Sequence, residues 1–194
     1  ELVQALAQRL QPELDRAHAA RDRALAGPAL ALAQLLPDPE AGFAARVGEL
    51  ARFPASGEPF RDGEGPALLL IPGGRLAGFP SPFAITVSEI TRADYERYAR
   101  ASGREAARCR DGGKAYSWRD PGFAQGADEP VVCVSYGDAV SYAQWLSQQT
   151  GRAYRLPTLA EWNALQSAAR VDTCANLKGE SPACQDRYRA TAPA

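Results

Sequence analysis

The stretch that decides the fold is Tyr154-Arg155-Leu156-Pro157-Thr158-Leu159-Ala160-Glu161-Trp162. Thr158 followed three residues later by Glu161 forms a capping box, in which two side chains accept hydrogen bonds from backbone N–H groups that a helix start leaves unpaired. Pro157 suits the first turn of such a helix, because it lacks an N–H and its φ is already helical. This pattern predicts a helix whose apolar face is made of Leu159, Trp162, Leu165 and Ala169.

The same capping signal occurs twice upstream. Ser135 and Asp138 have this spacing and predict a helix that continues to Gly151. A Thr and an Asp at the ends of residues 91–94 predict another helix, which stops at Gly103. The sequence therefore predicts three helices with marked amino-terminal caps in residues 91–170.

Short apolar runs lie between these helices. Residues 67–71, bounded by Pro and Gly, are typical of a buried strand, and residues 83–87 and 131–134 are predicted as two further strands.

A long irregular segment, about residues 104–129, separates the predicted helix over 91–103 from the strand at 131–134. Loops of this length are usually functional or need extra fastening. Aromatic, charged and amide side chains near its middle are the candidates for a recognition surface, although packing in the core is the favoured interpretation even there. They are Trp118, Arg119, Asp120, Phe123 and Gln125.

The four cysteines fall into two local pairs, Cys109 with Cys133 and Cys174 with Cys184. Disulfides within such pairs would fasten irregular backbone and would indicate an oxidising compartment, whereas four buried thiols would be compatible with the cytosol. A zinc site is disfavoured, because no C-x-x-C pair exists and the only histidine, His18, lies far from the cysteines in sequence.

Residues 1–53 form an Ala- and Arg-rich leader with three predicted helices. Pro12 should start or kink the first helix, and Gly27 with the following proline should end it. The second helix should run to about residue 36 and the third over residues 40–53. Leucines repeat every four residues along the first of them, at Leu2, Leu6, Leu10 and Leu14. We expect the leader to be a spacer or an association element, or alternatively a helical hairpin packed within its own domain.

Composition narrows the classes of partner. The 194 residues carry a formal net charge of -1, with 22 Lys and Arg against 23 Asp and Glu, so nucleic acid is not an expected partner. No apolar run approaches the roughly 20 residues of a membrane span. Residue 1 is Glu rather than Met, and we expect any targeting segment to lie outside this sequence.

Three stretches in order resemble the formylglycine-generating-enzyme family, also known as the sulfatase-modifying-factor family. The first contains Ser88-Glu89-Ile90-Thr91 and Asp94-Tyr95; the second runs from Trp118 to Gln125 and on through Pro130 to Leu146; the third runs from Gly151 to Trp162. The resemblance covers roughly residues 66–170. The composition divides the chain into a leader at 1–53 and a linker at 54–65, and the resemblance makes residues 66–194 the amino-terminal half of the family domain. The implied fold is α+β and C-type-lectin-like.

The same resemblance also implies which functions to expect. Enzymes of the family convert a sulfatase cysteine to formylglycine with copper and oxygen, and many members bind calcium, but the catalytic cysteines and most calcium ligands belong to the carboxy-terminal half. No catalytic or metal-binding residue is therefore carried over to this chain, and no cofactor is expected without that half. We expect a non-catalytic module for protein recognition or regulation, located outside the cytoplasm in the bacterial periplasm by analogy with family members. A fragment of the copper-dependent oxidase is the alternative.

The remaining residues that match the family have structural explanations. A cap, a first-turn proline and two core tryptophans account for them, and an ion pair between Arg155 and Asp138 could join the last two helices. The set is Asp138, Trp145, Arg155, Pro157, Thr158, Glu161 and Trp162.

Overall fold

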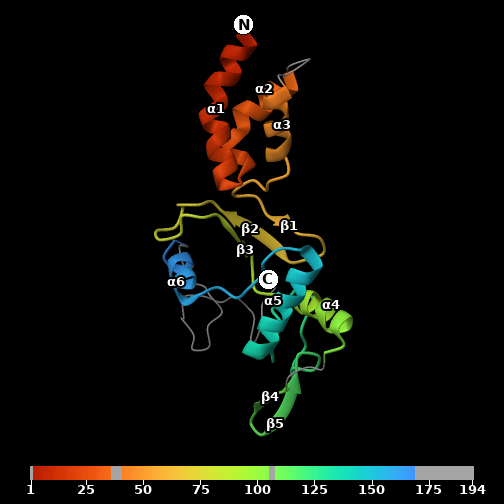
Figure 1. Cartoon of the computed structure of the whole chain (residues 1–194). Coiled ribbons are helices and arrows are strands. Elements are labelled where there is room, and N and C mark those ends of the chain that lie inside the picture. Colours follow the sequence, from red (N-terminus) through yellow and green to blue (C-terminus); the bar gives the residue numbers. More distant parts are fainter. Residues whose placement is uncertain (1, 36–40, 105–107, 169–194) are drawn as a thin grey trace. The chain divides into compact units, whose positions relative to one another are not determined.

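A computed structural model describes residues 2–35, 41–104 and 108–168 of the chain (Figure 1). The chain divides into two compact units. One comprises Glu1–Phe60 with Ala67–Val87, and the other comprises Arg61–Pro66 with Ser88–Ala194. Within the described ranges, no helix is both long enough and apolar enough to cross a membrane.

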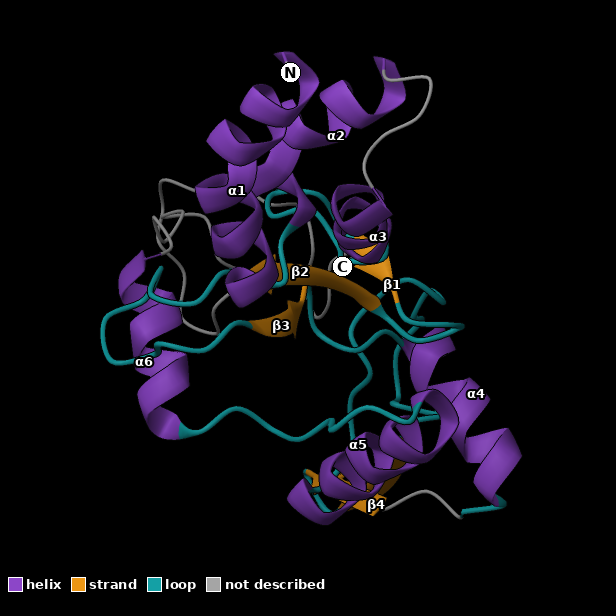
Figure 2. Cartoon of the chain, turned by 45° about the horizontal axis from the view of Figure 1, so that its top comes forward, coloured by secondary structure: helices purple, strands orange, loops and turns teal. Residues whose placement is uncertain are grey.

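The first unit begins with the leader helices α1 (Leu2–Ala20), α2 (Gly27–Leu35) and α3 (Ala41–Leu50), with a short 3₁₀ helix, η1 (Arg23–Ala26), between the first two (Figure 2). Their apolar faces share one core, so the leader packs on itself. Its fully or nearly buried members are Leu14, Ala17, Ala26, Ala29, Phe43, Val47 and Leu50.

The boundaries of the leader helices differ from the prediction at two places. α1 continues through Pro12, and it ends at Ala20 rather than at Gly27. Gly27 instead begins α2, because a proline at residue 28 is well suited to the first turn of a helix. Asp22, which is completely buried, caps η1 by accepting hydrogen bonds from the N–H groups of Ala24 (2.9 Å) and Ser56 (2.8 Å).

A small antiparallel sheet follows, in the order β1 (Phe60–Arg61), β2 (Ala67–Ile71) and β3 (Phe83–Thr86). β2 pairs with β3 in the register that sets Leu69 opposite Ile85. The strands predicted at 67–71 and 83–87 are thus present. β2 buries only its alternate side chains, Leu68 and Leu70, so it is a one-faced strand.

The second unit contains α4 (Arg92–Ser102), α5 (Tyr136–Thr150) and α6 (Leu159–Ala168). The capping boxes predicted for α4 and α5 are both formed, and both helices end at a glycine with positive φ, Gly103 and Gly151. Between α4 and α5 lies an aromatic core in which ring centroids of neighbours are 5.3 to 6.1 Å apart. Its rings belong to Tyr95, Tyr98, Trp118, Tyr142 and Trp145.

The predicted irregular segment contains a β-hairpin that the sequence analysis missed. β4 (Arg108–Asp111) and β5 (Lys114–Ser117) pair antiparallel, with Asp111 opposite Lys114 (Figure 1). The intervening Gly112 and Gly113 have φ values of 55° and 82°, as a tight two-residue hairpin turn requires.

The strand predicted at 131–134 is absent. The chain makes only an isolated bridge there, between Thr91 and Pro130. Cys133 has a φ of 57°, in the left-handed region, and this conformation is incompatible with a continuous strand.

The predicted core face of α6 is also wrong. Leu159 and Trp162 are 75% and 50% exposed, whereas Glu161 is only 7% exposed. The helix is oriented by its buried capping carboxylate rather than by its apolar residues. Leu165 is half-buried, Pro157 precedes the helix instead of forming its first turn, and Ala169 lies outside the described residues.

A disulfide joins Cys109 on β4 to Cys133 before α5, and this confirms the first predicted pair. The second pair, Cys174 and Cys184, lies outside the described residues. The described bond closes a loop of 24 residues in sequence that contains the hairpin and the residues up to the capping segment of α5.

Replacing both cysteines, as in Cys109→Ser with Cys133→Ser, should lower the free energy of unfolding by about 3 kcal/mol, because the open loop gives the unfolded chain more conformational freedom. Urea unfolding followed by circular dichroism measures this difference. A loss below about 1 kcal/mol would mean that the hairpin is held by its other contacts.

Candidate functional site

The best-defined polar feature of the second unit joins the end of α4 to the start of α5. Asp138 is 3% exposed and accepts hydrogen bonds from the hydroxyl (2.7 Å) and the N–H (3.0 Å) of Ser135. Its other carboxylate oxygen accepts from Nε of Arg104 at 3.0 Å. Arg104 also donates to the hydroxyl of Ser141 at 3.0 Å, so its guanidinium lies along the first turns of α5.

Burial by itself would raise the pKa of Asp138, but the hydrogen bonds from Ser135 and Arg104 outweigh it, and the net effect lowers the pKa below its usual value. Asp138 therefore remains ionised and holds Arg104 in place at neutral pH. Behind this pair, burial raises the pKa of Tyr95 to about 12, and burial also raises the pKa of Tyr142. Both phenols are consequently neutral core groups.

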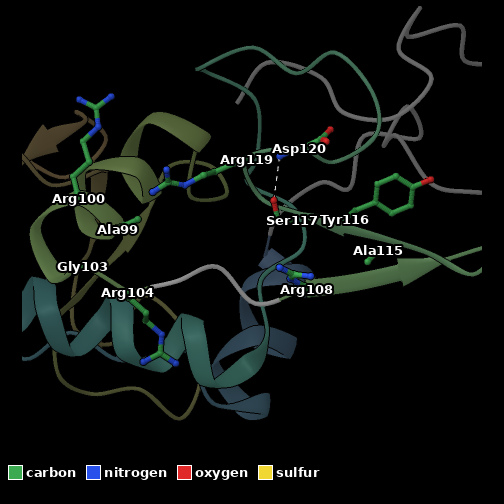
Figure 3. A pocket seen from close by; sticks show the side chains of 10 residues that line it. All are labelled: Ala99, Arg100, Gly103, Arg104, Arg108, Ala115, Tyr116, Ser117, Arg119 and Asp120. Atoms are coloured by element: carbon green, nitrogen blue, oxygen red, sulfur yellow. Dashed lines mark hydrogen bonds between the residues drawn. The ribbon is translucent and has the colours of Figure 1, made fainter.

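Arg104 lies on the edge of a pocket of about 610 Å³ (Figure 3). The pocket is bounded by the carboxy-terminal end of α4, by the hairpin and by the turn that follows β5. Its lining residues are Ala99, Arg100, Gly103, Arg104, Arg108, Ala115, Tyr116, Ser117, Arg119 and Asp120. Four arginines and a single acid make the lining strongly basic.

The four arginines are held differently. Arg100 pairs with Glu96 one turn earlier on α4 (2.7 Å), and Arg104 pairs with Asp138. Arg119 lies over the ring of Trp118, 4.8 Å from its centroid, and points toward α4 in Figure 3. For Arg108 and Arg119, no carboxylate within the part of the chain that the structure describes lies at ion-pair distance.

The backbone that carries Arg119 is itself fixed. Arg92 at the start of α4 donates hydrogen bonds to the carbonyl oxygens of Arg119 (3.3 Å) and Gln125 (2.8 Å). The turn closes through the N–H of Ser117, which donates to the carbonyl oxygen of Asp120 at 3.0 Å. These contacts hold the basic side chain in position before any ligand arrives.

The ring of Tyr116 lies against Gly122, which has a φ of 86°. A Cβ at this glycine would come within 2.3 Å of the ring, so only glycine fits there without displacing Tyr116. The turn after β5 is thus packed onto the hairpin.

The predicted recognition residues divide between the pocket and the core. Arg119 and Asp120 line the pocket, and Phe123 is 39% exposed nearby in sequence. Trp118 is only 2% exposed, so this residue packs in the core. The side-chain amide of Gln125 donates a hydrogen bond to the carbonyl oxygen of Pro130 at 2.8 Å.

Three arginines of the pocket were not predicted from the sequence: Arg100, Arg104 and Arg108. Their spacing of four residues was a signal, but a helix-face interpretation would have placed all three in solvent. The turn of the chain at Gly103 and the hairpin bring them against the loop instead.

A second buried carboxylate organises the start of α6. Glu161 accepts hydrogen bonds from both terminal nitrogens of Arg155 (2.7 Å each) and from the N–H and hydroxyl of Thr158 (2.7 and 3.0 Å). The Arg155 guanidinium, followed by the Thr158 bonds, lowers the pKa of Glu161 from 4.5 to about 2. The suggested pair of Arg155 with Asp138 does not form, because each has a closer partner.

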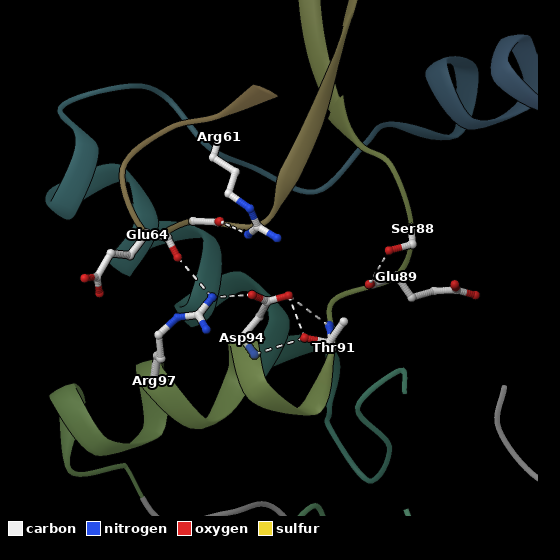
Figure 4. Close-up of polar contacts among 8 residues, drawn as sticks. Arg61, Glu64, Ser88, Glu89, Thr91, Asp94 and Arg97 are labelled. Atoms are coloured by element: carbon white, nitrogen blue, oxygen red, sulfur yellow. Dashed lines mark hydrogen bonds and ion pairs between the residues drawn. The ribbon is translucent and has the colours of Figure 1, made fainter. Parts of the chain in front are cut away.

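The third such carboxylate, Asp94, ties α4 to the segment 61–65 (Figure 4). Asp94 accepts from the hydroxyl of Thr91 at 2.7 Å and pairs with Arg97, which also donates to the carbonyl oxygen of Glu64 at 3.0 Å. Arg61 donates to the carbonyl oxygen of Gly65 at 2.8 Å. Residues that were expected to be a linker therefore form an ordered attachment.

No group of three or more His, Cys, Asp or Glu side chains suited to a metal ion occurs among the described residues. Cys109 and Cys133 are bonded to each other, so they do not present the free thiolates that a copper ion on cysteine requires. The described residues do not fit a copper centre.

Comparisons with known proteins agree with the resemblance seen in the sequence. Residues 55–189 match the family of the sulfatase-modifying factor enzyme 1-like domain. A stretch of 57 residues, 29% of this chain, is 51% identical to the formylglycine-generating enzyme of Mycobacterium tuberculosis (strain ATCC 25618 / H37Rv), but it spans only 16% of that enzyme. The solved structure of PvdO from Pseudomonas aeruginosa has 29% identity and a TM-score of 0.49, covering 55% of this chain and 49% of that one.

Arg104→Ala should lower the melting temperature by several degrees, because it leaves the buried Asp138 carboxylate without its cationic partner. Arg100→Ala is the matched control, since it removes only an exposed pair within α4 and should change the melting temperature little. Thermal unfolding by circular dichroism compares the two, and equal losses would contradict the role given to Arg104.

Glu161 should make stability depend on pH in acid. Its pKa is depressed on folding, so its contribution is present above its ordinary value of 4.5 and is lost as the pH falls toward about 2. Glu161→Gln should therefore lower the melting temperature at pH 6, and the difference from wild type should shrink through this interval. Glu96→Gln, on the exposed surface of α4, serves as the control. A difference that is the same at every pH would exclude this contribution of Glu161.

Proposed function

This chain belongs to the family of sulfatase-modifying factor enzyme 1-like domains, and from that premise we propose that it is a recognition module for another protein that performs no chemistry of its own. The recognition surface is the arginine-lined pocket with the neighbouring loop at residues 118–125. The observation that carries the proposal is that both described cysteines are used to fasten this loop.

The fastening supports recognition in a specific way. The disulfide closes the segment that contains Ser117, Arg119 and Asp120, and Arg92 holds the backbone of the same segment from the other side. A loop that is held before binding loses little conformational entropy when a partner arrives. Rigid presentation of charged side chains is a property of binding surfaces as well as of enzymes.

A second candidate function is supported by the 51% identity to a protein named formylglycine-generating enzyme. In this alternative, the chain is part of a copper-dependent oxidase that converts a sulfatase cysteine to formylglycine. The matched stretch spans 16% of that enzyme, so its activity cannot be transferred residue by residue. Copper or calcium would have to be bound by residues other than those that the structure describes.

The proposal includes an extracytoplasmic location in a bacterium, supported by the disulfide and by the bacterial origin of the formylglycine-generating enzyme that it resembles. Bacterial periplasm is the compartment that suits it best. We propose that the leader is a spacer. Self-association of the chain through the leader is the alternative, and sedimentation velocity would measure it. The apolar faces of its helices are buried against one another, so they are not available to a second copy, and this favours the spacer.

The test compares wild type with the Cys109→Ser, Cys133→Ser variant in two assays. In the first, each immobilised chain is offered an extracytoplasmic extract; a partner retained by wild type and weakened with the variant is expected. In the second, a sulfatase-type cysteine peptide is incubated with each chain, copper and oxygen, and aldehyde is sought by mass spectrometry.

The two assays separate the candidates. Capture of a partner without aldehyde formation supports the recognition module. Aldehyde formed by wild type would establish the oxidase alternative and overturn the proposal. Equal capture by wild type and variant would show that the fastened loop is not the recognition surface.

A further inference from the structure

We infer that the arginine-lined pocket binds an extended acidic peptide segment of a partner protein, laid along β5. The inference rests on the proposed function and names the chemistry of the partner at the same surface. Three properties of the pocket lead to it: its uncompensated charge, its size and the part of the hairpin that lines it.

The charge that is available comes from Arg108 and Arg119. Asp138 and Glu96 already compensate Arg104 and Arg100, and these pairs hold the wall of the pocket. Arg108 and Arg119 have no such carboxylate among the described residues, and each offers a planar fork of donors that matches a carboxylate. Asp120 contributes one opposing charge, so the pocket favours two carboxylates over a denser cluster of negative charge.

The volume indicates a ligand larger than a single anion. At about 610 Å³, the pocket is of the size that takes several covalently linked groups, and one small oxyanion would leave most of it filled with water. A short length of polypeptide with two acidic side chains would fill it and would also reach Arg108 and Arg119.

The hairpin supplies an edge suited to such a segment. Ala115, Tyr116 and Ser117 are consecutive residues of β5, and all three line the pocket. Side chains alternate between the two faces of a strand, so three consecutive residues can share one pocket only where it runs along the strand's edge. β4 and β5 form a sheet of two strands, and among the described residues no third strand covers that edge. The N–H of Ser117 already donates to the carbonyl oxygen of Asp120, so a peptide would use the part of the edge at Ala115. Extended peptides bind to open edges by adding a strand.

The experiment uses the full chain and a fluorescein-labelled peptide of alternating glutamate and valine, titrated by fluorescence anisotropy at low ionic strength. Arg108→Gln with Arg119→Gln should weaken binding about tenfold or more, because both charge-assisted contacts are removed. The matched control is Arg75→Gln with Arg110→Gln, which removes the same charge from exposed arginines that do not line the pocket. The control should retain most of the affinity.

Three outcomes would overturn the inference. The first is equal weakening by the two double variants, which would reduce the effect to net charge. The second is equal binding of the same peptide with glutamine in place of glutamate. The third is displacement of the peptide by sulfate far beyond the effect of sodium chloride at matched ionic strength, which would indicate a site for a single oxyanion.

Wild-type protein provides a readout that does not depend on any variant folding. In amide NMR spectra, the peptide should shift the signals of Gly103, Ala115 and Ser117 before those of the leader. Shifts confined to other residues would contradict the placement. If a partner is still captured by the Arg108, Arg119 double variant, the acidic-peptide inference fails while the proposed function stands; if wild type captures no partner, the proposed function fails whatever the peptide does.

Discussion

The contact between Arg104 and Asp138 is the constraint on which the second unit depends. A buried carboxylate is tolerated only with its hydrogen-bonding capacity satisfied, and Asp138 meets that requirement with Ser135 on its own helix and Arg104 after α4. Because one group serves both helices, the end of α4 is fixed against the start of α5. The aromatic core fills the space between these helices, and the pocket opens where Arg104 leaves them.

The same arrangement occurs three times, with small changes. A hydroxyl caps the helix, an acid three residues later completes the box, and an arginine covers the remaining carboxylate oxygen. In α4 and α6 that arginine is close in sequence, Arg97 and Arg155, whereas in α5 it comes from a different element. At α5 the local capping signal is thereby linked to Arg104, a residue that also lines the pocket.

Local rules predicted the capped ends of α4, α5 and α6, the strands β2 and β3 and the disulfide of Cys109, since each depends on neighbouring residues. The failures have several causes. The positive φ of Cys133 prevents a strand that its apolar neighbours favour, and burial of Glu161 turns Trp162 outward. The Gly112-Gly113 turn was readable but overlooked. Only Arg119 and Asp120 of the pocket were foreseen, because its other arginines gather through the turn at Gly103.

The disulfide also affects how this surface can change during evolution. It fixes the two ends of the segment between Cys109 and Cys133, and this segment is anchored to α4 by the Trp118 ring and by the hydrogen bonds of Arg92. The entropic cost of closing a ring rises slowly, by about 0.6 kcal/mol for each doubling of its length. Insertions at the exposed tip of the hairpin, residues 111–114, therefore cost little within the closed ring, whereas a change at Trp118 would reach the core that α4 and α5 share.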